Sequence, residues 1–277
     1  MPLNARRHVR RMRGGAQSHL LEADDGNFYV VKFLNNPQHR RILVNELIAA
    51  SFFRYLQIAV PETAIVSVSE EFLAENPEAC LQLGASRVPV AAGWHFGSRF
   101  PGDPATLAVY DFLPDALLEQ VSNLAHFIGA LVLDKWMSNA DARQAVYFRA
   151  RIGNWAASGG GKTRHTGFLA CMIDHGFVFN GPHWELQDAP LQGLAPRPLV
   201  YQAVKSWDDF QPWLDQVLHF PEEVVDQARR QVPPQWLEGD EPVLDDVLES
   251  LLRRRQRVPA LIDECRRARP GLFPEWK

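Results

Sequence analysis

The sequence of 277 residues has little cysteine, no long apolar run and no excess of basic residues. Its three cysteines, Cys80, Cys171 and Cys265, are far apart and odd in number, which indicates reduced thiols rather than a disulfide framework or a zinc site. No apolar run approaches the roughly 20 residues that span a bilayer, and residues 1–13 lack the apolar core of a secretory signal. We therefore expect a cytoplasmic protein with no membrane partner.

The charge balance argues against a nucleic-acid partner. The formal net charge is −4, from 29 lysines and arginines against 33 aspartates and glutamates, whereas nucleic-acid binding needs a basic surplus on some face. The basic run at residues 252–257 is more typical of a solvated helix face. The hydrophobic content of 46% is enough for a large core, in one domain or in two lobes.

Hydrophobic periodicity divides the chain into a β-rich first third and a mainly helical remainder. The predicted strands cover residues 8–13, 19–23, 28–34, 63–68, 106–112, 145–149 and 167–173, and the predicted helices cover residues 40–56 (amphipathic) and 119–137 (buried). Residues 70–104 show no clear pattern. This order indicates an α+β fold of two lobes, residues 1–112 and residues 113–277.

Two short acidic motifs lie on either side of a predicted hairpin. Asn139-Ala-Asp141-Ala-Arg143-Gln144 follows the buried helix, and Ile173-Asp174-His175-Gly176 ends an apolar strand. Phosphoryl transfer from a metal-bound nucleotide needs two such carboxylates, one to orient the acceptor hydroxyl and one to hold Mg²⁺. The alternative is a pair of ordinary turns, because Asn and Asp favour turns in any case.

A glycine turn and a strand lysine precede these motifs in the order that a kinase needs. Residues 14–18, Gly-Gly-Ala-Gln-Ser, lie between two short strands, where backbone N–H groups can approach phosphate oxygens. Lys32 is inside an apolar strand, and Glu46 follows on the next helix, as in the lysine–glutamate pair of protein kinases. Each feature alone also fits a hairpin turn, a strand-end lysine or a solvated glutamate, but their order favours a nucleotide site.

The run Ser158-Gly-Gly-Gly161-Lys162-Thr163 ends like a phosphate-binding P-loop. The first glycine of that pattern is replaced by Ala156, and a strand follows where a P-loop needs a helix. We therefore interpret the run as the tip of a hairpin. His95, which lies between aromatic residues and has no other metal-ligating residue nearby in the sequence, is expected to be packed and hydrogen bonded.

From residue 14 to about residue 180, the chain resembles the HipA-like kinases, a bacterial branch of the protein-kinase-like fold. The resemblance implies a two-lobed fold with a β-rich N-lobe and a mainly helical C-lobe. Gly15-Ala16-Gln17 is similar to the family's phosphate loop, and Val31-Lys32-Phe33 to its nucleotide-binding strand. The resemblance further implies that Asp141 is the catalytic aspartate, that Asp174 binds the metal, and that the hinge Tyr110-Asp111-Phe112 contacts adenine. The implied nucleotide-binding residues are Gly14, Gly15, Gln17, Ser18, Lys32, Glu46, Tyr110 and Phe112.

The chain departs from the toxin kinases of that family in three ways. Their metal-binding asparagine, five residues after the catalytic aspartate, is replaced by Val146, so that Gln144 would have to supply the oxygen. The chain begins almost at the glycine turn, without their extra N-terminal subdomain, which argues against a toxin role and an antitoxin partner. The glycine-rich hairpin lengthens the gap between Asp141 and Asp174. The better match is therefore to stand-alone HipA-like kinase domain proteins.

The expected function is ATP-dependent transfer of a phosphoryl group to a hydroxyl, with ATP and Mg²⁺ as cofactors. A Ser or Thr of a protein is favoured over a small-molecule acceptor, because the His-Gly-Asp loop of many small-molecule kinases is absent. Asp141 would orient the hydroxyl, and Arg143 would neutralise developing charge. The alternative is a pseudokinase that binds nucleotide or a partner without chemistry, and Val146 is the residue that supports it.

Overall fold

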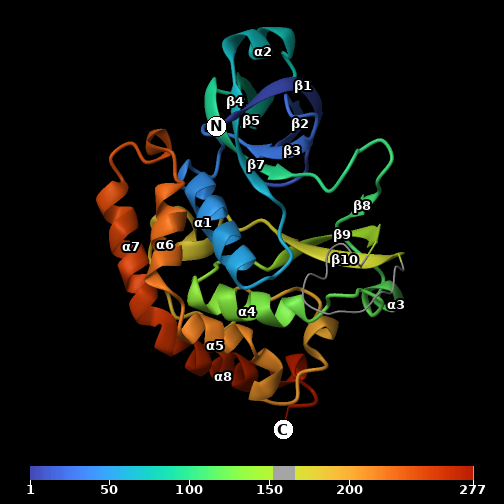
Figure 1. Cartoon of the computed structure of the whole chain (residues 1–277), viewed down its shortest axis with the longest axis vertical. Helices are drawn as coiled ribbons and strands as arrows, with labels where there is room; N and C mark the ends of the chain where they lie inside the picture. The colour runs from blue at the N-terminus through green and yellow to red at the C-terminus, as the bar shows by residue number, and fades with distance from the viewer. Residues whose placement is uncertain (152–165, 277) are drawn as a thin grey trace.

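The computed structural model describes residues 1–151 and 166–276 and has a mixed α and β architecture (Figure 1). Five strands near the N-terminus form a closed barrel in the order β1-β2-β3-β7-β4, in which β1 pairs parallel with β4 and the other pairs are antiparallel. The barrel strands are β1 (Leu3–Arg11), β2 (His19–Ala23), β3 (Phe28–Lys32), β4 (Thr63–Val68) and β7 (Gly93–Arg99). The β-rich beginning of the chain is thus present.

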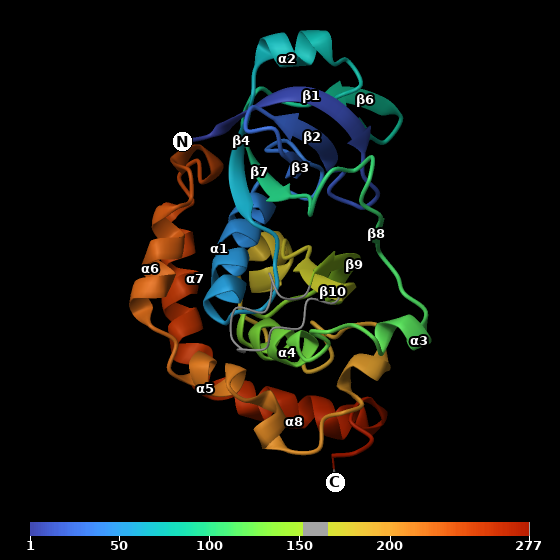
Figure 2. The same ribbon diagram turned by 45° about the vertical axis from the view of Figure 1, so that its right-hand side comes forward.

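Residues 70–104, which the sequence left unassigned, contain short elements above the barrel. Helix α2 (Glu70–Glu75) and the hairpin of β5 (Cys80–Leu83) and β6 (Ser86–Pro89) precede the barrel strand β7. Figure 2 shows α2 and β6 at the end of the barrel that faces away from the helices. Strand β7 pairs with both β3 and β4, so its position depends on long-range contacts rather than on a local pattern.

A second sheet, in the order β10-β9-β8, lies between the barrel and the helices (Figure 1). It contains β8 (Val109–Tyr110), β9 (Gln144–Arg151) and β10 (Thr166–Ile173). Strand β8 is shorter than the predicted strand 106–112, because the backbone oxygen of Asp103 accepts hydrogen bonds from the amides of Thr106 and Leu107 and holds them in a turn. The glycine-rich run at 158–163 lies outside the described residues.

Helix α1 (Arg41–Tyr55) follows β3 in the chain and lies where a helix was predicted. It was expected to be amphipathic, but it is buried on nearly all sides, because it lies between the barrel and the helices that follow (Figure 2). Two polar residues inside it, Asn45 and Glu46, are therefore buried as well. Burial of polar groups on an otherwise apolar helix requires partners, and both residues find them near β10.

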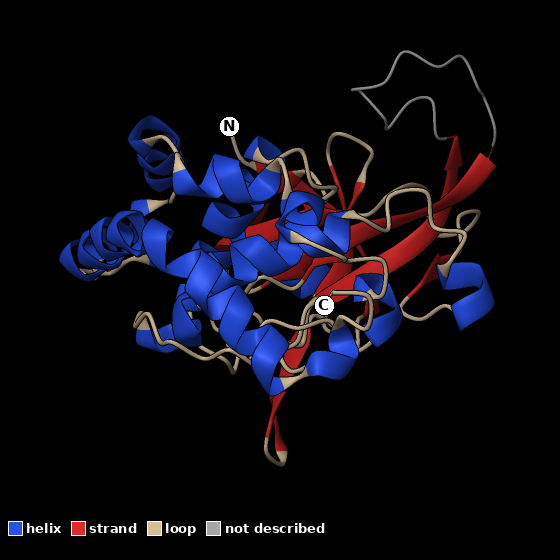
Figure 3. Ribbon diagram, turned by 90° about the horizontal axis from the view of Figure 1, so that it is seen from below, coloured by secondary structure: helices blue, strands red, loops and turns tan. Residues whose placement is uncertain are grey.

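The remainder of the chain is mainly helical, and the view from below shows its helices beside the strands (Figure 3). Helix α4 contacts α1, α5 and α8. Helix α4 begins later than predicted, because Val121 is extended and bridges to Phe168. Within the described residues, no helix is long and apolar enough to span a membrane. The α-helices are α3 (Asp115–Leu118), α4 (His126–Trp136), α5 (Trp213–Leu218), α6 (Glu222–Arg230), α7 (Glu241–Arg254) and α8 (Val258–Ala268). The short 3₁₀ helices are η2 (Val178–His183), η3 (Pro198–Tyr201), η4 (Trp207–Phe210), η5 (Pro234–Trp236), η6 (Arg255–Arg257) and η7 (Pro270–Leu272).

His95 on β7 is packed and hydrogen bonded, as expected. Its ring is fully buried, its Nδ1 accepts a hydrogen bond from the amide of Leu34 at 3.0 Å, and its Nε2 donates to the carbonyl of Ala91 at 2.9 Å. Only the neutral ring can accept at Nδ1 while it donates at Nε2. Burial accordingly lowers the pKa of His95 to about 4.

This histidine should make the fold sensitive to acid. The unfolded chain binds a proton near pH 6.5 and the folded chain does not, so the stabilisation by neutral His95 is lost as pH falls from about 6.5 towards 4. We expect a loss of about 2 kcal/mol between pH 7 and pH 5, measured by urea unfolding. His95→Gln should flatten this decline, whereas His219→Gln, at an exposed residue after α5, should not. Equal slopes for the two variants would contradict the prediction.

Candidate active site

The side chains of Lys32, Glu46 and Asp174 meet where the barrel, α1 and β10 come together. Lys32 is the last residue of β3 and is 8% exposed. Its Nζ donates one hydrogen bond to the Glu46 carboxylate and a second to Oδ1 of Asp174 at 2.6 Å. The structure thus brings together a strand lysine, a helix glutamate and the aspartate after β10, which is 142 residues from the lysine.

Lys32 and Asp174 stabilise each other's charge, whereas burial, together with the Asp174 carboxylate, raises the pKa of Glu46. Burial lowers the pKa of Lys32, but the carboxylates of Glu46 and Asp174 outweigh burial, and the pKa is raised. Burial alone would raise the pKa of Asp174, yet the Lys32 ammonium outweighs it and the pKa ends below its usual value. Asp174 is therefore ionised at neutral pH, which is the state that a metal ligand requires.

The side chain of Asn45 on α1 is hydrogen bonded to the backbone of the segment after Asp174. The Nδ2 of Asn45 lies 2.7 Å from the carbonyl oxygen of Gly176 and 3.0 Å from that of Val178, and its Oδ1 accepts from the Trp184 indole at 2.8 Å. Gly176 packs so tightly on this helix that an added Cβ would lie 2.5 Å from a methyl carbon of Ile42. The sequence interpretation missed Asn45, although a polar residue inside an apolar helix is a readable signal.

The loop after α4 carries Asp141 and lies against the segment after Asp174. The amide of Ala140 donates to the carbonyl of Phe177 at 2.9 Å, and the amide of Asn180 donates to the carbonyl of Ser138 at 3.1 Å. Asp141 is partly exposed, and its Oδ1 accepts a hydrogen bond from the amide of Ala142 at 2.7 Å. The two acidic motifs of the sequence therefore form one structural unit, with Asp141 left accessible.

Gln144 lies beside Asp174, as its expected role as a metal ligand requires. It pairs with Ile173 across β9 and β10, and its side chain is hydrogen bonded to the Asp174 carboxylate. The described residues hold no group of three or more His, Cys, Asp or Glu that could bind a metal by themselves. Magnesium commonly takes only one or two protein oxygens and completes its shell with water and phosphate. Asp174 with Gln144 fits that donor set.

Arg143, which we expected to face the transferred phosphate, is directed into the core. Its Nε and Nη2 donate to the two carboxylate oxygens of Asp134, and its Nη1 donates to the carbonyl of Ile173 at 2.9 Å. The same Nη1 lies 3.0 Å from Nδ1 of His175, which burial keeps neutral by lowering its pKa well below the usual value. Both members of the Arg143–Asp134 pair are fully buried. The guanidinium thus joins α4, the Asp141 loop and the end of β10.

The glycine turn between β1 and β2 is held by Gln17. The Nε2 of Gln17 donates to the carbonyl of Gln82 at 2.7 Å, and its Oε1 accepts from the Gln82 amide at 2.6 Å. Gly14 has a φ of +122°, a conformation that side-chain-bearing residues rarely adopt. A Cβ on Gly15 would lie 2.7 Å from the Gln38 side chain, and Ser18 is buried. Any contact of this turn with a ligand would therefore come from its backbone.

A cavity of about 170 Å³ lies next to Gln144. It is lined by Asp111, Phe112, Phe127, residues 143–145, Tyr147, Ile173 and residues 195–197. Phe112, an expected hinge residue, is 62% exposed, and Arg197 lies over its ring. The other expected hinge residue, Tyr110, is in β8 and half-exposed. An apolar cavity of about 150 Å³ holds a benzene ring, so this one can take a group of similar size.

A family model described as HipA-like kinase matches residues 7–147, just over half of the chain. The matched range includes the glycine turn, Lys32, Asp141 and Gln144 and ends before Asp174. No curated protein sequence matches the chain.

Solved structures with similar folds include protein kinases. The structure of the Golgi casein kinase has a TM-score of 0.50 and 13% identity, and the match covers 97% of this chain and 74% of that chain. The same kinase with Mn/ADP bound has a TM-score of 0.46 at 11% identity, covering 97% and 73%. Hydra Fam20 with sugar has a TM-score of 0.49 at 12% identity, covering 96% and 85%. At these identities the similarity concerns the fold alone.

Proposed function

The chain belongs to the HipA-like kinase family, and we propose that it is an ATP-dependent phosphotransferase with an active site between two lobes. The lobes would be residues 1–112, which include the barrel and α1, and residues 113–277, which include the Asp141 loop and the helices. The observation that carries the proposal is the pair of hydrogen bonds from Lys32 to Glu46 and Asp174. In protein kinases the strand lysine and its helix glutamate must be in place for transfer.

Each expected site residue has a role in this proposal. Backbone amides of residues 14–18 and the ammonium of Lys32 would bind the phosphates of ATP. Asp174 and Gln144 would hold Mg²⁺, which neutralises charge on the phosphates when bound. Asp141 would orient the acceptor hydroxyl and take up its proton. Tyr110 and Phe112 stay predictions for the adenine end.

Arg143 would act as a positioning residue rather than as a group that contacts phosphate. All three guanidinium nitrogens already have partners, and the side chain is closed to solvent. Its contacts join Asp134 on α4 to the carbonyl of Ile173, the residue before Asp174. Arg143 would thereby hold the catalytic loop at a set distance from the metal-binding aspartate.

We place the adenine end of ATP next to the cavity of about 170 Å³, because the expected hinge residue Phe112 and the proposed metal ligand Gln144 both line it. The size of the cavity suits a small ring. A Ser or Thr of a protein remains the favoured acceptor, and a small-molecule hydroxyl is the alternative.

The competing proposal is a pseudokinase, and one observation favours it. Val146 stands where the toxin kinases have a metal-binding asparagine, and its aliphatic side chain cannot ligate Mg²⁺. A pseudokinase would bind nucleotide as well without Mg²⁺ as with it and would form no product.

The proposed function can be tested by thermal shift with ATP, with and without Mg²⁺, and by intact-mass analysis after incubation with Mg²⁺-ATP. We expect a Mg²⁺-dependent shift and, with wild type, ADP formation or an added phosphate. Asp174→Asn should lose the dependence on Mg²⁺, whereas Asp226→Asn, at an exposed residue of α6, should behave as wild type. A shift that is the same with and without Mg²⁺, without product, would support the pseudokinase instead.

A further inference from the structure

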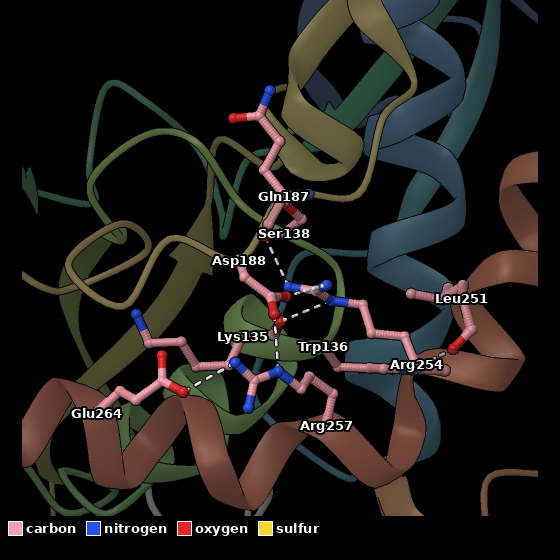
Figure 4. A network of polar contacts seen from close by, with 9 residues as sticks. All are labelled: Lys135, Trp136, Ser138, Gln187, Asp188, Leu251, Arg254, Arg257 and Glu264. Atoms are coloured by element: carbon pink, nitrogen blue, oxygen red, sulfur yellow. Dashed lines mark hydrogen bonds and ion pairs between the residues drawn. The ribbon is translucent and has the colours of Figure 1, made fainter.

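Residues 187–194, which all lie in the described part of the chain, form no helix or strand and are contacted by side chains from other elements. Figure 4 shows the contacts at Gln187 and Asp188. Lys135 at the end of α4 is 2% exposed, and its Nζ donates to the carbonyls of Pro190, at 2.6 Å, and Gln192. The hydroxyl of Ser138 donates to the backbone carbonyl of the first residue of the segment at 3.0 Å and accepts from its amide at 2.9 Å. These donors fix the backbone of the segment against the end of α4.

Arg254, the last residue of α7, holds the segment from its other side. Its Nη1 lies 2.5 Å from Oδ1 of Asp188, its Nη2 donates to the carbonyl of Gln187 at 2.7 Å, and its Nε lies 3.4 Å from the carbonyl of Lys135. Arg257 binds the second carboxylate oxygen of Asp188 at 2.7 Å. The Arg254 side chain is 9% exposed and that of Asp188 is 41% exposed, so the ion pair lies at the protein surface with its guanidinium mostly covered. Figure 4 shows the carboxylate between the two guanidinium groups.

The far end of the segment contacts the loop that carries Asp141. The amide of Gly193 donates to the carbonyl of Asp141 at 3.1 Å, and the amide of Arg143 donates to the carbonyl of Leu194 at 3.1 Å. Gly193 also packs on α4, where an added Cβ would lie 2.7 Å from Cβ of Asp134. The segment therefore connects the end of α7 to the catalytic loop, and it continues into the cavity wall at residues 195–197.

We propose that Arg254 is a positioning residue for phosphoryl transfer, which fixes the Asp141 loop by holding residues 187–194. The proposal rests on the proposed kinase function. Without Arg254, residues 187–194 keep their contacts to Lys135 and Ser138. They lose the guanidinium that links the Asp188 carboxylate and the Gln187 carbonyl to the carbonyl of Lys135 on α4. Residues 187–194 are then held less firmly next to the carbonyl of Asp141 and the cavity wall. A misplacement of about 1 Å in an active site can cost about 10²-fold in rate.

The geometry explains why an arginine is needed at this position. Arg254 uses Nε, Nη1 and Nη2 for three different partners, in the forked arrangement that a guanidinium provides. A lysine would keep only a point charge for Asp188. Arg254→Lys should therefore recover part of the activity that Arg254→Ala loses.

The test compares Arg254→Ala, Arg254→Lys and Asp188→Asn with Arg253→Ala, a matched control at the neighbouring residue of α7, whose side chain is 69% exposed. The rate of ADP formation from Mg²⁺-ATP and amide hydrogen exchange are measured on the full chain. We expect Arg254→Ala to lower kcat about 10- to 100-fold with KM for ATP within about twofold of wild type. Exchange should rise at residues 187–194 and 138–143, and the double variant Asp188→Asn/Arg254→Ala should be no slower than Arg254→Ala.

Three results would overturn the inference. They are a normal kcat for Arg254→Ala, unchanged exchange at residues 138–143, or an effect equal to that of Arg253→Ala. A wild-type protein that forms no ADP would instead refute the proposed function. Hydrogen exchange at residues 138–143 would in that case still decide whether Arg254 fixes the loop.

Discussion

Asp141→Asn is expected to lower the rate of phosphoryl transfer by about 10²- to 10⁴-fold, the usual contribution of a positioned acid or base. The amide of asparagine has nearly the size of the carboxylate but cannot accept a proton from the acceptor hydroxyl. Asp141 is partly exposed and lies apart from the contacts of Lys32, so that the affinity for nucleotide should be unchanged. ADP formation and intact mass after incubation with Mg²⁺-ATP measure the rate, and thermal shift measures nucleotide binding.

The control for this variant is Asp226→Asn, which changes the same functional group on the outer side of α6. It should retain the wild-type rate. If Asp141→Asn also retains that rate, Asp141 is not the catalytic aspartate. If instead both transfer and the ATP-dependent shift are lost, the variant has disturbed the nucleotide site, and the separation of roles between Asp141 and Asp174 fails.

The elements that sequence reasoning found are those with a local pattern. The strands around residues 19–23 and 28–34 and the helix α1 follow from short hairpin signals and from the spacing of apolar residues. Strand β7 was not found, because its place between β3 and β4 depends on residues about 30 and 70 positions away. The short hairpin β5–β6 has even less of a pattern.

In the candidate site, too, some residues could be identified from a sequence pattern and others only from tertiary packing. Lys32, Glu46 and Asp174 could be grouped because their order in the chain matches a known arrangement, and the structure brings their side chains into contact. The partner of Arg143 could not be read in this way. Asp134 is nine residues earlier across the end of a helix, and only tertiary packing closes both charges to solvent. A carboxylate on an otherwise apolar helix was nevertheless a signal of a buried pair.

The hydrogen bonds between Gln17 and Gln82, like the Arg143–Asp134 pair, could not be predicted from the sequence. Gln17 was assigned to nucleotide binding from its place in the glycine turn, and the structure shows its amide bonded to the backbone of β5. Because β5 lay in the unassigned residues 70–104, the sequence offered no partner for this side chain. The turn can still bind phosphate through its backbone, and the side chain then keeps the turn in shape.

Asp134→Ala is expected to lower the free energy of unfolding by about 3–5 kcal/mol, the usual cost of removing one partner from a buried ion pair. The guanidinium of Arg143 would keep its charge inside the core but lose its ion-pair partner, with only the more distant carboxylates of Glu46 and Asp174 acting on it. Domains of ordinary stability unfold with about 5–15 kcal/mol, so this loss is a large fraction of the total. Urea unfolding followed by tryptophan fluorescence measures it, since Trp136 lies on the same helix.

Two further variants decide what the pair does. Asp245→Ala breaks a surface ion pair with Arg229, in which the aspartate is 55% exposed, and should cost less than about 1 kcal/mol. The double variant Asp134→Leu/Arg143→Met removes both charges and should be more stable than Asp134→Ala, because no unpaired charge remains in the core. If Asp134→Ala costs no more than Asp245→Ala, the guanidinium of Arg143 can leave the pair at little cost. Arg143 would then be free to turn towards the phosphates, as its position in the motif first indicated.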